Sequence, residues 1–251
     1  MNSALLLLAL AVTAPAFAQM PVNPESAAKA KELFGRAVKA LGGDAFLHVQ
    51  TAQFEGRVYG FRRGDLSALA QVVQYVRYPD QSREEYGEKK EEIQITNGDK
   101  GWMVDINGVH AVPEEEMKPR RESRSMRAFY VLRYRLGEAG SIVEYVGRDL
   151  WESREVEVVR FVDKENNVLT FSLESSTALP ARTTWVHRDA KTRERIEEVE
   201  TFGNYFTRDG IATPRRTVRL RNGTRVFEAV IREAHFNVPH PDSLFVPPPG
   251  N

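Results

Sequence analysis

The histidines and paired carboxylates are the side chains of this sequence that come nearest to reactive chemistry. His235, His240 and Asp242 have the residue types of a divalent-metal site, but His235 falls in a strand-like segment and His240 stands between two prolines. Glu197 and Glu198 have the residue types of an acid–base pair, yet runs of like charge are usually solvated surface. The sequence therefore predicts no catalytic residues and no metal ligands.

Other signatures of enzymes and cofactors are missing from the sequence as well. It contains no G-x-S-x-G nucleophile motif, no glycine-rich phosphate loop, and no cysteine for disulfides, thiol catalysis or iron–sulfur clusters. The 35 basic and 35 acidic side chains cancel, which argues against a nucleic-acid binder. Because 41% of the residues are hydrophobic and 10% aromatic, the chain is not disordered. We therefore expect a folded protein that is not an enzyme and needs no cofactor.

The N-terminus has the pattern of an export signal. An apolar run from Ala4 to Ala14 is followed by Ala16-Phe17-Ala18, which fits the small-x-small cleavage rule. The alternative is an uncleaved membrane anchor, but the run is only about half of the roughly 20 residues that a spanning helix needs. We therefore predict a signal peptide over residues 1–18, cleavage after Ala18, and export to a bacterial periplasm. The absence of cysteine excludes an N-terminal lipid anchor.

The elements that follow predict one α+β domain over residues 19–251. Asn23-Pro24-Glu25 combines an N-cap, a first-turn proline and a first-turn acid, and the helix that it starts ends at Gly42-Gly43. From Thr51 the hydrophobic period switches towards two, which indicates antiparallel strands. A sheet this large must curl or be covered. The later strands are predicted at 142–149, 154–162, 167–173, 181–188, 194–206, 211–221 and 225–236.

A second helix is predicted within the run of strands, from Arg120 to Leu136. On a helical wheel its apolar side chains gather on one side and its arginines on the other, with Val131 as an exception. One interpretation is a lid whose apolar side closes the sheet and whose basic side docks on anionic lipid or an acidic partner. The other is an ordinary packed helix with a solvated arginine face. The apolar side comprises Met126, Phe129, Leu132 and Leu136; the basic side comprises Arg120, Arg124, Arg127 and Arg135.

Several short motifs, in this order, resemble the LolA-like family of outer-membrane lipoprotein carriers. The resemblance spans most of the chain after residue 18, although Ala178 stands where the family usually has glycine. The motifs are Ala40-Leu41-Gly42-Gly43 with Leu47 and Val49, Gly98-Asp99-Lys100-Gly101-Trp102, Leu169 to Pro180 ending Thr177-Ala178-Leu179-Pro180, Tyr205 to Pro214, and Phe236-Asn237-Val238-Pro239 with Leu244-Phe245.

The resemblance implies a mainly antiparallel, strongly curved, incomplete β-barrel that is covered by the N-terminal helix and the inserted amphipathic helix. It also implies a hydrophobic cavity for acyl chains. Large apolar side chains of the strands and of the inserted helix are the candidates to line that cavity; the alternative is that they fill a closed core. The candidates are Phe54, Val58, Trp102, Val104, Met126, Phe129, Leu132, Phe171, Trp185, Phe202 and Phe206.

Two functions are consistent with these features. The first is a periplasmic carrier for a lipid or for lipoprotein acyl chains, with an envelope membrane protein or a lipoprotein as a possible partner. The second is a non-catalytic interaction or stress-sensing module of the same fold that carries no lipid. The two differ in whether the protein contains an acyl ligand.

We predict that the mature protein starts at Gln19, because Ala16-Phe17-Ala18 follows a short apolar run. N-terminal sequencing of protein purified from the native periplasm measures this directly. A chain that begins at Met1 and sediments with membranes would contradict both the cleavage and the export of a soluble carrier.

Overall fold

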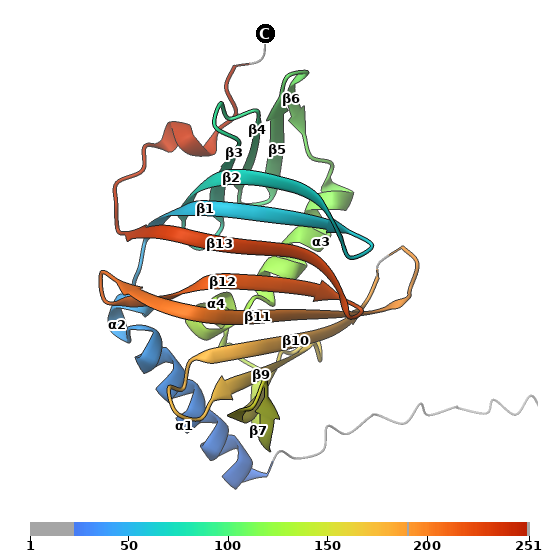
Figure 1. The fold of residues 1–251 in the computed structure, drawn as a ribbon. Coiled ribbons are helices and arrows are strands. Elements are labelled where there is room, and N and C mark those ends of the chain that lie inside the picture. The colour runs from blue at the N-terminus through green and yellow to red at the C-terminus, as the bar shows by residue number, and fades with distance from the viewer. Residues whose placement is uncertain (1–22, 190, 250–251) are drawn as a thin grey trace, which may run out of the picture.

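The computed structural model describes residues 23–189 and 191–249, and these contain one 13-stranded antiparallel sheet. The predicted signal peptide and its cleavage site lie outside the described residues. Neighbouring strands in the sheet follow the order β6-β5-β4-β3-β2-β1-β13-β12-β11-β10-β9-β8-β7, so the first and the last strand, β1 and β13, pair in the middle of the sheet. The sheet is strongly curved and does not close into a barrel (Figure 1).

Most strand bounds agree with the sequence prediction. The strands are β1 Thr51–Arg62, β2 Asp65–Arg77, β3 Gln81–Tyr86, β4 Glu92–Asn97, β5 Lys100–Asp105, β6 Gly108–Ala111, β7 Ile142–Trp151, β8 Arg154–Val162, β9 Val168–Glu174, β10 Pro180–Arg188, β11 Arg195–Arg208, β12 Ile211–Arg221 and β13 Thr224–Phe236. The mainly antiparallel α+β class is therefore confirmed. The sequence analysis missed β3, because Gln-Ser-Arg-Glu-Glu-Tyr has no apolar alternation.

The N-terminal helix α1, Pro24–Leu41, forms as predicted. The Asn23 side chain accepts a hydrogen bond from the backbone N–H of Glu25 at 2.9 Å, which caps the helix. Phe34 meets Phe171 of β9 edge to face, with ring centroids 5.2 Å apart. The helix ends at Gly42, whose φ is 129° and where a Cβ would lie 2.5 Å from the Gly210 carbonyl oxygen. Only glycine therefore allows this approach of α1 to the β11–β12 turn. The short helix α2, Asp44–Leu47, follows.

The inserted segment differs from the single helix predicted over 120–136. Helix α3 runs from Glu114 to Ser125 and contains Pro119 in its interior, so this proline does not start the helix. The chain is then extended at Arg127, and a second helical stretch consists of α4, Ala128–Tyr130, and a π-helical turn η1, Val131–Arg135. Helix α3 packs on β5 where a Cβ on Gly101 would lie 2.5 Å from the Met117 sulfur.

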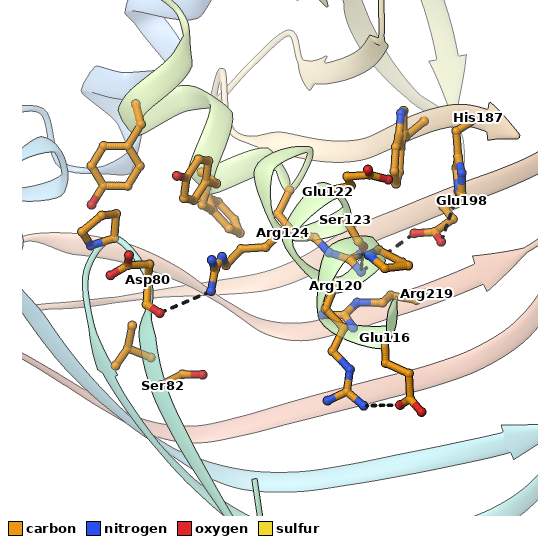
Figure 2. A pocket seen from close by; sticks show the side chains of 18 of the residues that line it. Asp80, Ser82, Glu116, Arg120, Glu122, Ser123, Arg124, His187, Glu198 and Arg219 are labelled. Carbon is orange, nitrogen blue, oxygen red and sulfur yellow. Dashed lines mark hydrogen bonds and ion pairs between the residues drawn. The ribbon is translucent and has the colours of Figure 1, made fainter. Parts of the chain in front are cut away.

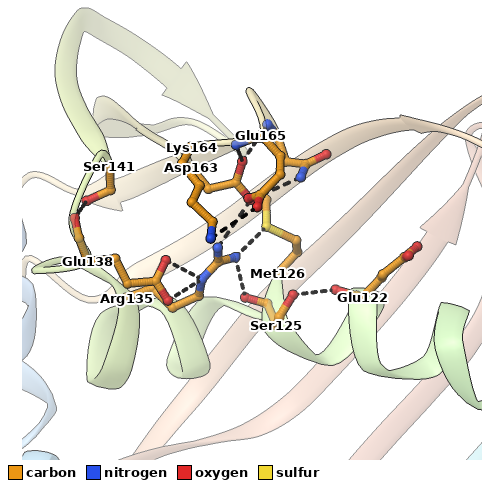
Figure 3. A network of polar contacts seen from close by, with 10 residues as sticks. Glu122, Ser125, Met126, Arg135, Glu138, Ser141, Asp163, Lys164 and Glu165 are labelled. Carbon is orange, nitrogen blue, oxygen red and sulfur yellow. Dashed lines mark hydrogen bonds and ion pairs between the residues drawn. The ribbon is translucent and has the colours of Figure 1, made fainter.

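The break rotates the two halves of the inserted segment, so one helical wheel does not describe it. Val131, the exception on the wheel, is fully buried. Arg135 is also buried, at 8% exposed, although the wheel placed it on a solvated face. Figure 3 shows how it is accommodated: its guanidinium contacts Asp163 at 3.1 Å and Glu138 at 3.0 Å. Asp163, in the β8–β9 turn, is itself 3% exposed. This buried ion pair anchors the end of the inserted segment to the sheet.

The C-terminal tail covers part of the other face of the sheet. A 3₁₀ turn η2, Asp242–Phe245, buries Phe245, and the Asn97 side chain donates to the Phe245 carbonyl at 3.2 Å. Arg77 holds the same tail through the His240 carbonyl at 2.6 Å and the Asp242 carboxylate at 2.8 Å. Among the described residues, no helix is both long and apolar enough to cross a membrane.

We predict that Arg135→Met lowers the free energy of unfolding by about 3 kcal/mol, because it leaves the Asp163 carboxylate buried without its cationic partner. Urea denaturation measures the change. The control is Arg160→Met, which removes a half-exposed partner of Glu144 and should cost well under about 1 kcal/mol. Equal losses in the two variants would show that the Arg135 pair does not anchor the segment.

Candidate functional site

The inner face of the sheet, which faces α1 and the inserted segment, is filled over one half and open over the other. Along one row of cross-strand partners the residues change from Val159 and Phe171, through Thr183, to Glu200 and Arg219. Val159 and Phe171 are fully buried in the core that α1 and η1 cover. The row therefore turns from apolar to charged where the helical cover ends, and two connected cavities begin there.

The inner cavity, of about 510 Å³, lies against the middle of the sheet. Its volume is within the range of small-molecule sites. Aromatic and aliphatic side chains from β1, β11, β12, β13 and α4 form the apolar part of its wall, and arginines, glutamates and other polar side chains form the rest. The apolar side chains are Phe54, Val58, Phe129, Phe202, Ile211, Phe227, Ala229, Ile231 and Phe236. This apolar part of the wall suits a hydrocarbon chain.

The outer cavity, of about 860 Å³, runs beneath α3 and shares residues with the inner one. About half of the residues in its wall are charged, with acids and bases in nearly equal number, many of them from α3, β3 and the β10–β11 turn. Figure 2 shows Arg124 donating to the Asp80 carbonyl at 3.3 Å, and Arg120 paired with Glu116 at 3.5 Å. Phe54, Glu84, Arg120, Arg127 and Arg219 line both cavities and so mark their junction.

Glu200 is the buried charge at this junction. It is 7% exposed, and its Oε1 accepts from Arg127 Nη1 at 2.7 Å and from Arg219 Nε at 2.8 Å. Burial alone would raise the pKa of Glu200, but the two guanidinium groups hold it below its ordinary value. Glu200 is therefore a carboxylate clamped between an arginine of the inserted segment and an arginine of the sheet.

Glu84 behaves in the opposite way. It is half-buried, receives a hydrogen bond from the Gln74 amide at 2.9 Å, and lies within the fields of Arg120 and Arg219. Burial nevertheless dominates and raises the pKa of Glu84. Its neighbour Tyr86 also has a raised pKa, because burial disfavours the phenolate. The junction therefore combines a carboxyl group whose pKa is raised by burial with arginines, which stay charged.

The structure separates the residues that were predicted to line a cavity into three sets. Phe54, Val58, Phe129 and Phe202 lie on the wall of the inner cavity, and Phe54, Phe129 and Trp185 line the outer one. Met126, Leu132 and Phe171 belong to the filled core. The remaining three, Trp102, Val104 and Phe206, line neither cavity.

Strand alternation explains the position of Trp102 and Val104. The cavity residues of β4 are Gln94 and Thr96, so Ile93 and Ile95 point to the other face. Trp102 and Val104 are the cross-strand partners of Ile95 and Ile93 and share that face. Trp102 and Val104 therefore face away from both cavities.

Phe206 packs elsewhere. It lies at the edge of the filled core, with the guanidinium of Arg215 4.4 Å above its ring. The sequence alone could not assign its strand face, because apolar residues occur on both faces of β11.

Of the four arginines that were predicted to form a basic docking face, three line the outer cavity and the fourth is buried. Arg120 and Arg127 line both cavities, Arg124 lines the outer one, and Arg135 is buried. The prediction of a single solvent-facing basic side is therefore corrected, because the break at Arg127 turns the two halves differently. The sequence analysis also missed Glu84, Glu200 and Arg219. For Glu200 a signal was available in the sequence. It is a charged residue two positions before the apolar Phe202, so strand alternation assigns the two side chains to the same face of the sheet.

The histidines are not brought together. The His240 ring lies against Tyr75, with Nε2 3.0 Å from the Ala52 carbonyl oxygen, while His235 lies on β13 with Nε2 3.7 Å from the Glu233 carboxylate. Within residues 23–189 and 191–249, no group of three or more potential ligands is arranged to hold a metal ion.

This architecture defines the class of protein: the chain has a LolA-like fold. It is similar to a DUF1329 family protein from Desulfovibrio piger, with a TM-score of 0.61 and 14% identity over 86% of this chain and 97% of that one. It is also similar to a putative outer membrane lipoprotein-sorting protein domain from Vibrio parahaemolyticus, with a TM-score of 0.55 and 12% identity over 88% and 96%.

A LolA superfamily protein from Nitrosomonas europaea has a TM-score of 0.54 and 9% identity over 86% of this chain and 97% of its own. No protein-family model and no curated protein matches the sequence significantly. At these identities the likeness concerns the fold. The family resemblance of the sequence motifs is thus confirmed as a likeness of architecture.

We predict that Glu84→Gln removes a destabilising contribution at high pH. The pKa of Glu84 in the folded protein is raised above its ordinary value of 4.5. The unfolded chain therefore loses this proton at a lower pH than the folded protein does. As a result, the stability of the wild type falls as the pH rises from 4.5 towards the folded pKa. The variant should therefore gain stability relative to wild type as the pH rises from about 4 to 8.

Urea denaturation at a series of pH values measures this difference. Glu88→Gln removes one exposed negative charge from the β3–β4 turn and serves as the control. A difference between Glu84→Gln and wild type that does not vary with pH would contradict the raised pKa.

Proposed function

We propose that this protein binds a hydrophobic, acyl-chain ligand in the inner cavity and carries it within the bacterial cell envelope. The observation that carries the proposal is the cavity of about 510 Å³, whose side toward β1 and β13 is apolar, placed beside a well-packed core. An apolar hollow that stays open is a binding feature.

The position of the inserted segment supports a carrier. Phe129 of α4 lies between the two regions: its ring is 5.2 Å from that of Phe202 and 6.5 Å from that of Phe46. Helix α3 covers the outer cavity and is joined to α4 by the extended residue Arg127. A ligand in the inner cavity would thus touch a segment that is held by side-chain contacts at both ends, which suits reversible loading.

The proposed location is the periplasm. The apolar run and Ala16-Phe17-Ala18 support export, and one of the structures with this fold is named as an outer membrane lipoprotein-sorting domain. The proposed partners are an acyl ligand and an envelope membrane protein or lipoprotein. We propose no catalytic role, because no serine or threonine hydroxyl among the described residues is hydrogen-bonded to a histidine.

The alternative is a non-catalytic interaction or stress-sensing module without lipid cargo. The outer cavity favours it, since its nearly balanced acids and bases would suit a polypeptide segment better than a hydrocarbon chain. Native mass spectrometry of the protein purified from its own periplasm separates the two. Copurified lipid supports the carrier, and protein free of lipid that also fails to bind added fatty acid contradicts it.

We predict that Ala229→Trp abolishes lipid binding while the protein stays folded. Ala229 lies on the sheet floor of the inner cavity, beside Val58 and Thr217, so an indole there would occupy the space of the ligand. Displacement of a fluorescent fatty acid should show at least about a tenfold loss of affinity, equivalent to about 1.4 kcal/mol. Thermal melts check that the fold is retained.

The matched control is Leu69→Trp, which adds an indole at an exposed position of β2 away from both cavities. It should bind lipid as wild type does. Full binding by a folded Ala229→Trp protein would show that the ligand does not occupy the inner cavity.

A further inference from the structure

The terminal nitrogens of Arg219 are free hydrogen-bond donors inside the protein. Its Nε is used by Glu200 at 2.8 Å, and its guanidinium lies 4.7 Å from the ring centroid of Phe227. Neither Nη1 nor Nη2 makes a hydrogen bond or ion pair with a described residue. The Arg219 side chain lines both cavities and is 38% exposed. Its terminal nitrogens therefore face the space at the junction of the cavities.

The neighbouring arginines differ in how far they are engaged. Both terminal nitrogens of Arg127 are engaged, by Glu200 at 2.7 Å and by the Ser123 hydroxyl at 2.8 Å, with Glu198 further away at 3.9 Å. Arg133 donates to the Phe46 carbonyl at 2.9 Å and stacks on the Phe46 and Tyr78 rings.

Arg120 has one loose ion pair, with Glu116 at 3.5 Å, in which both side chains are about half exposed. Both Arg120 and Arg219 act on the Glu84 carboxyl group, which places them on the same side of the junction. Arg219, Arg120 and Arg133 are therefore the junction arginines whose terminal nitrogens can take a further partner, and of these Arg219 and Arg120 act together on Glu84.

The inner cavity also carries an excess of positive charge. Four arginines line it, Arg120, Arg127, Arg133 and Arg219, against two glutamates, Glu84 and Glu200. A wall with more arginines than glutamates is poorly suited to a pure hydrocarbon ligand, because a charge that loses water without gaining a partner is costly. A ligand that brings its own negative charge would balance the arginines.

We propose that the junction binds the anionic headgroup, a carboxylate or a phosphate, of a ligand whose acyl chain lies in the inner cavity, with Arg219 and Arg120 as the headgroup contacts. This inference rests on the proposed function and specifies its ligand class. The paired N–H groups of a guanidinium match the two oxygens of a carboxylate or phosphate. Glu200 and Phe227 hold the Arg219 side chain in place before the ligand arrives, which reduces the ordering cost of binding.

The test compares ligands that share one chain and differ in headgroup. Displacement of a fluorescent fatty acid by hexadecanoate, by palmitoyl lysophosphatidic acid and by neutral hexadecanol is measured on the full-length mature protein. The pH is one at which the free fatty acid is ionised. Wild type should bind both anionic ligands about tenfold more tightly than hexadecanol, as expected for hydrogen bonds to a charged group.

The variants are Arg219→Gln, Arg219→Lys and Arg120→Gln, with Arg57→Gln as the control. Arg219→Gln should lose most of the preference for the anionic ligands and keep its affinity for hexadecanol. Arg219→Lys should keep part of the preference, because the charge remains and the fork is lost. Arg57 is exposed on the same sheet and lines neither of the two cavities, so its substitution should change nothing.

If Arg219→Gln fails to fold, Arg120→Gln provides the test. This substitution leaves Glu116 without an ion-pair partner, but Glu116 is exposed to water, so the fold should be retained. Equal affinity of wild type for hexadecanoate and hexadecanol, or an unchanged preference in the Arg219 and Arg120 variants, overturns the headgroup site and leaves the carrier function standing. Failure of wild type to bind any of the three ligands overturns the carrier function itself. Binding of inorganic phosphate alone as tightly as the lysophospholipid would show a free-anion site and overturn the inference.

Discussion

The structure depends on the burial of one carboxylate, Glu200, in the middle of the inner face. A carboxylate at that position is tolerable only with cationic partners, and it has two: Arg219 from the adjacent strand β12 and Arg127 from the inserted segment. Arg127 is also the extended residue at which the inserted segment breaks. Arg127, one of the two arginines that neutralise Glu200, thus lies at the break between α3 and α4. Helix α3 runs over the cavities, and α4 packs into the core.

The division of the sheet follows from this contact. On one side of Glu200 the inner face is apolar and closed by α1 and η1, and the Arg135–Asp163 pair holds the far end of the inserted segment down (Figure 3). On the other side α3 passes above the sheet and leaves a hollow space below it (Figure 2). One protein therefore contains a core that provides stability and an apolar cavity that remains available, with charged groups between them.

The inner cavity has both apolar and charged walls, unlike a purely hydrophobic pocket. The wall toward β1 and β13 is aromatic and aliphatic, whereas the junction presents arginines together with a glutamate whose burial favours the neutral form. Such a surface has an apolar end and a cationic end, so it matches amphiphiles better than hydrocarbons. The LolA-like fold supplies the curved sheet and its helical cover, and the identity of these few side chains decides what the space can hold.

Local signals in the sequence determined the class of fold, the start and end of α1, and nearly all of the later strands, because capping residues, Asn-Gly turns and alternating apolar residues act over a few residues. They did not reveal β3, whose residues are polar, or the break at Arg127, where neither glycine nor proline marks the end of α3. Nor did they show that Trp102 faces away from the cavity or that Glu200 and Arg219 face into it. Those outcomes depend on the strand register and on which half of the sheet the helices cover. Both are set by contacts between segments far apart in the chain, and therefore only the tertiary structure could decide them.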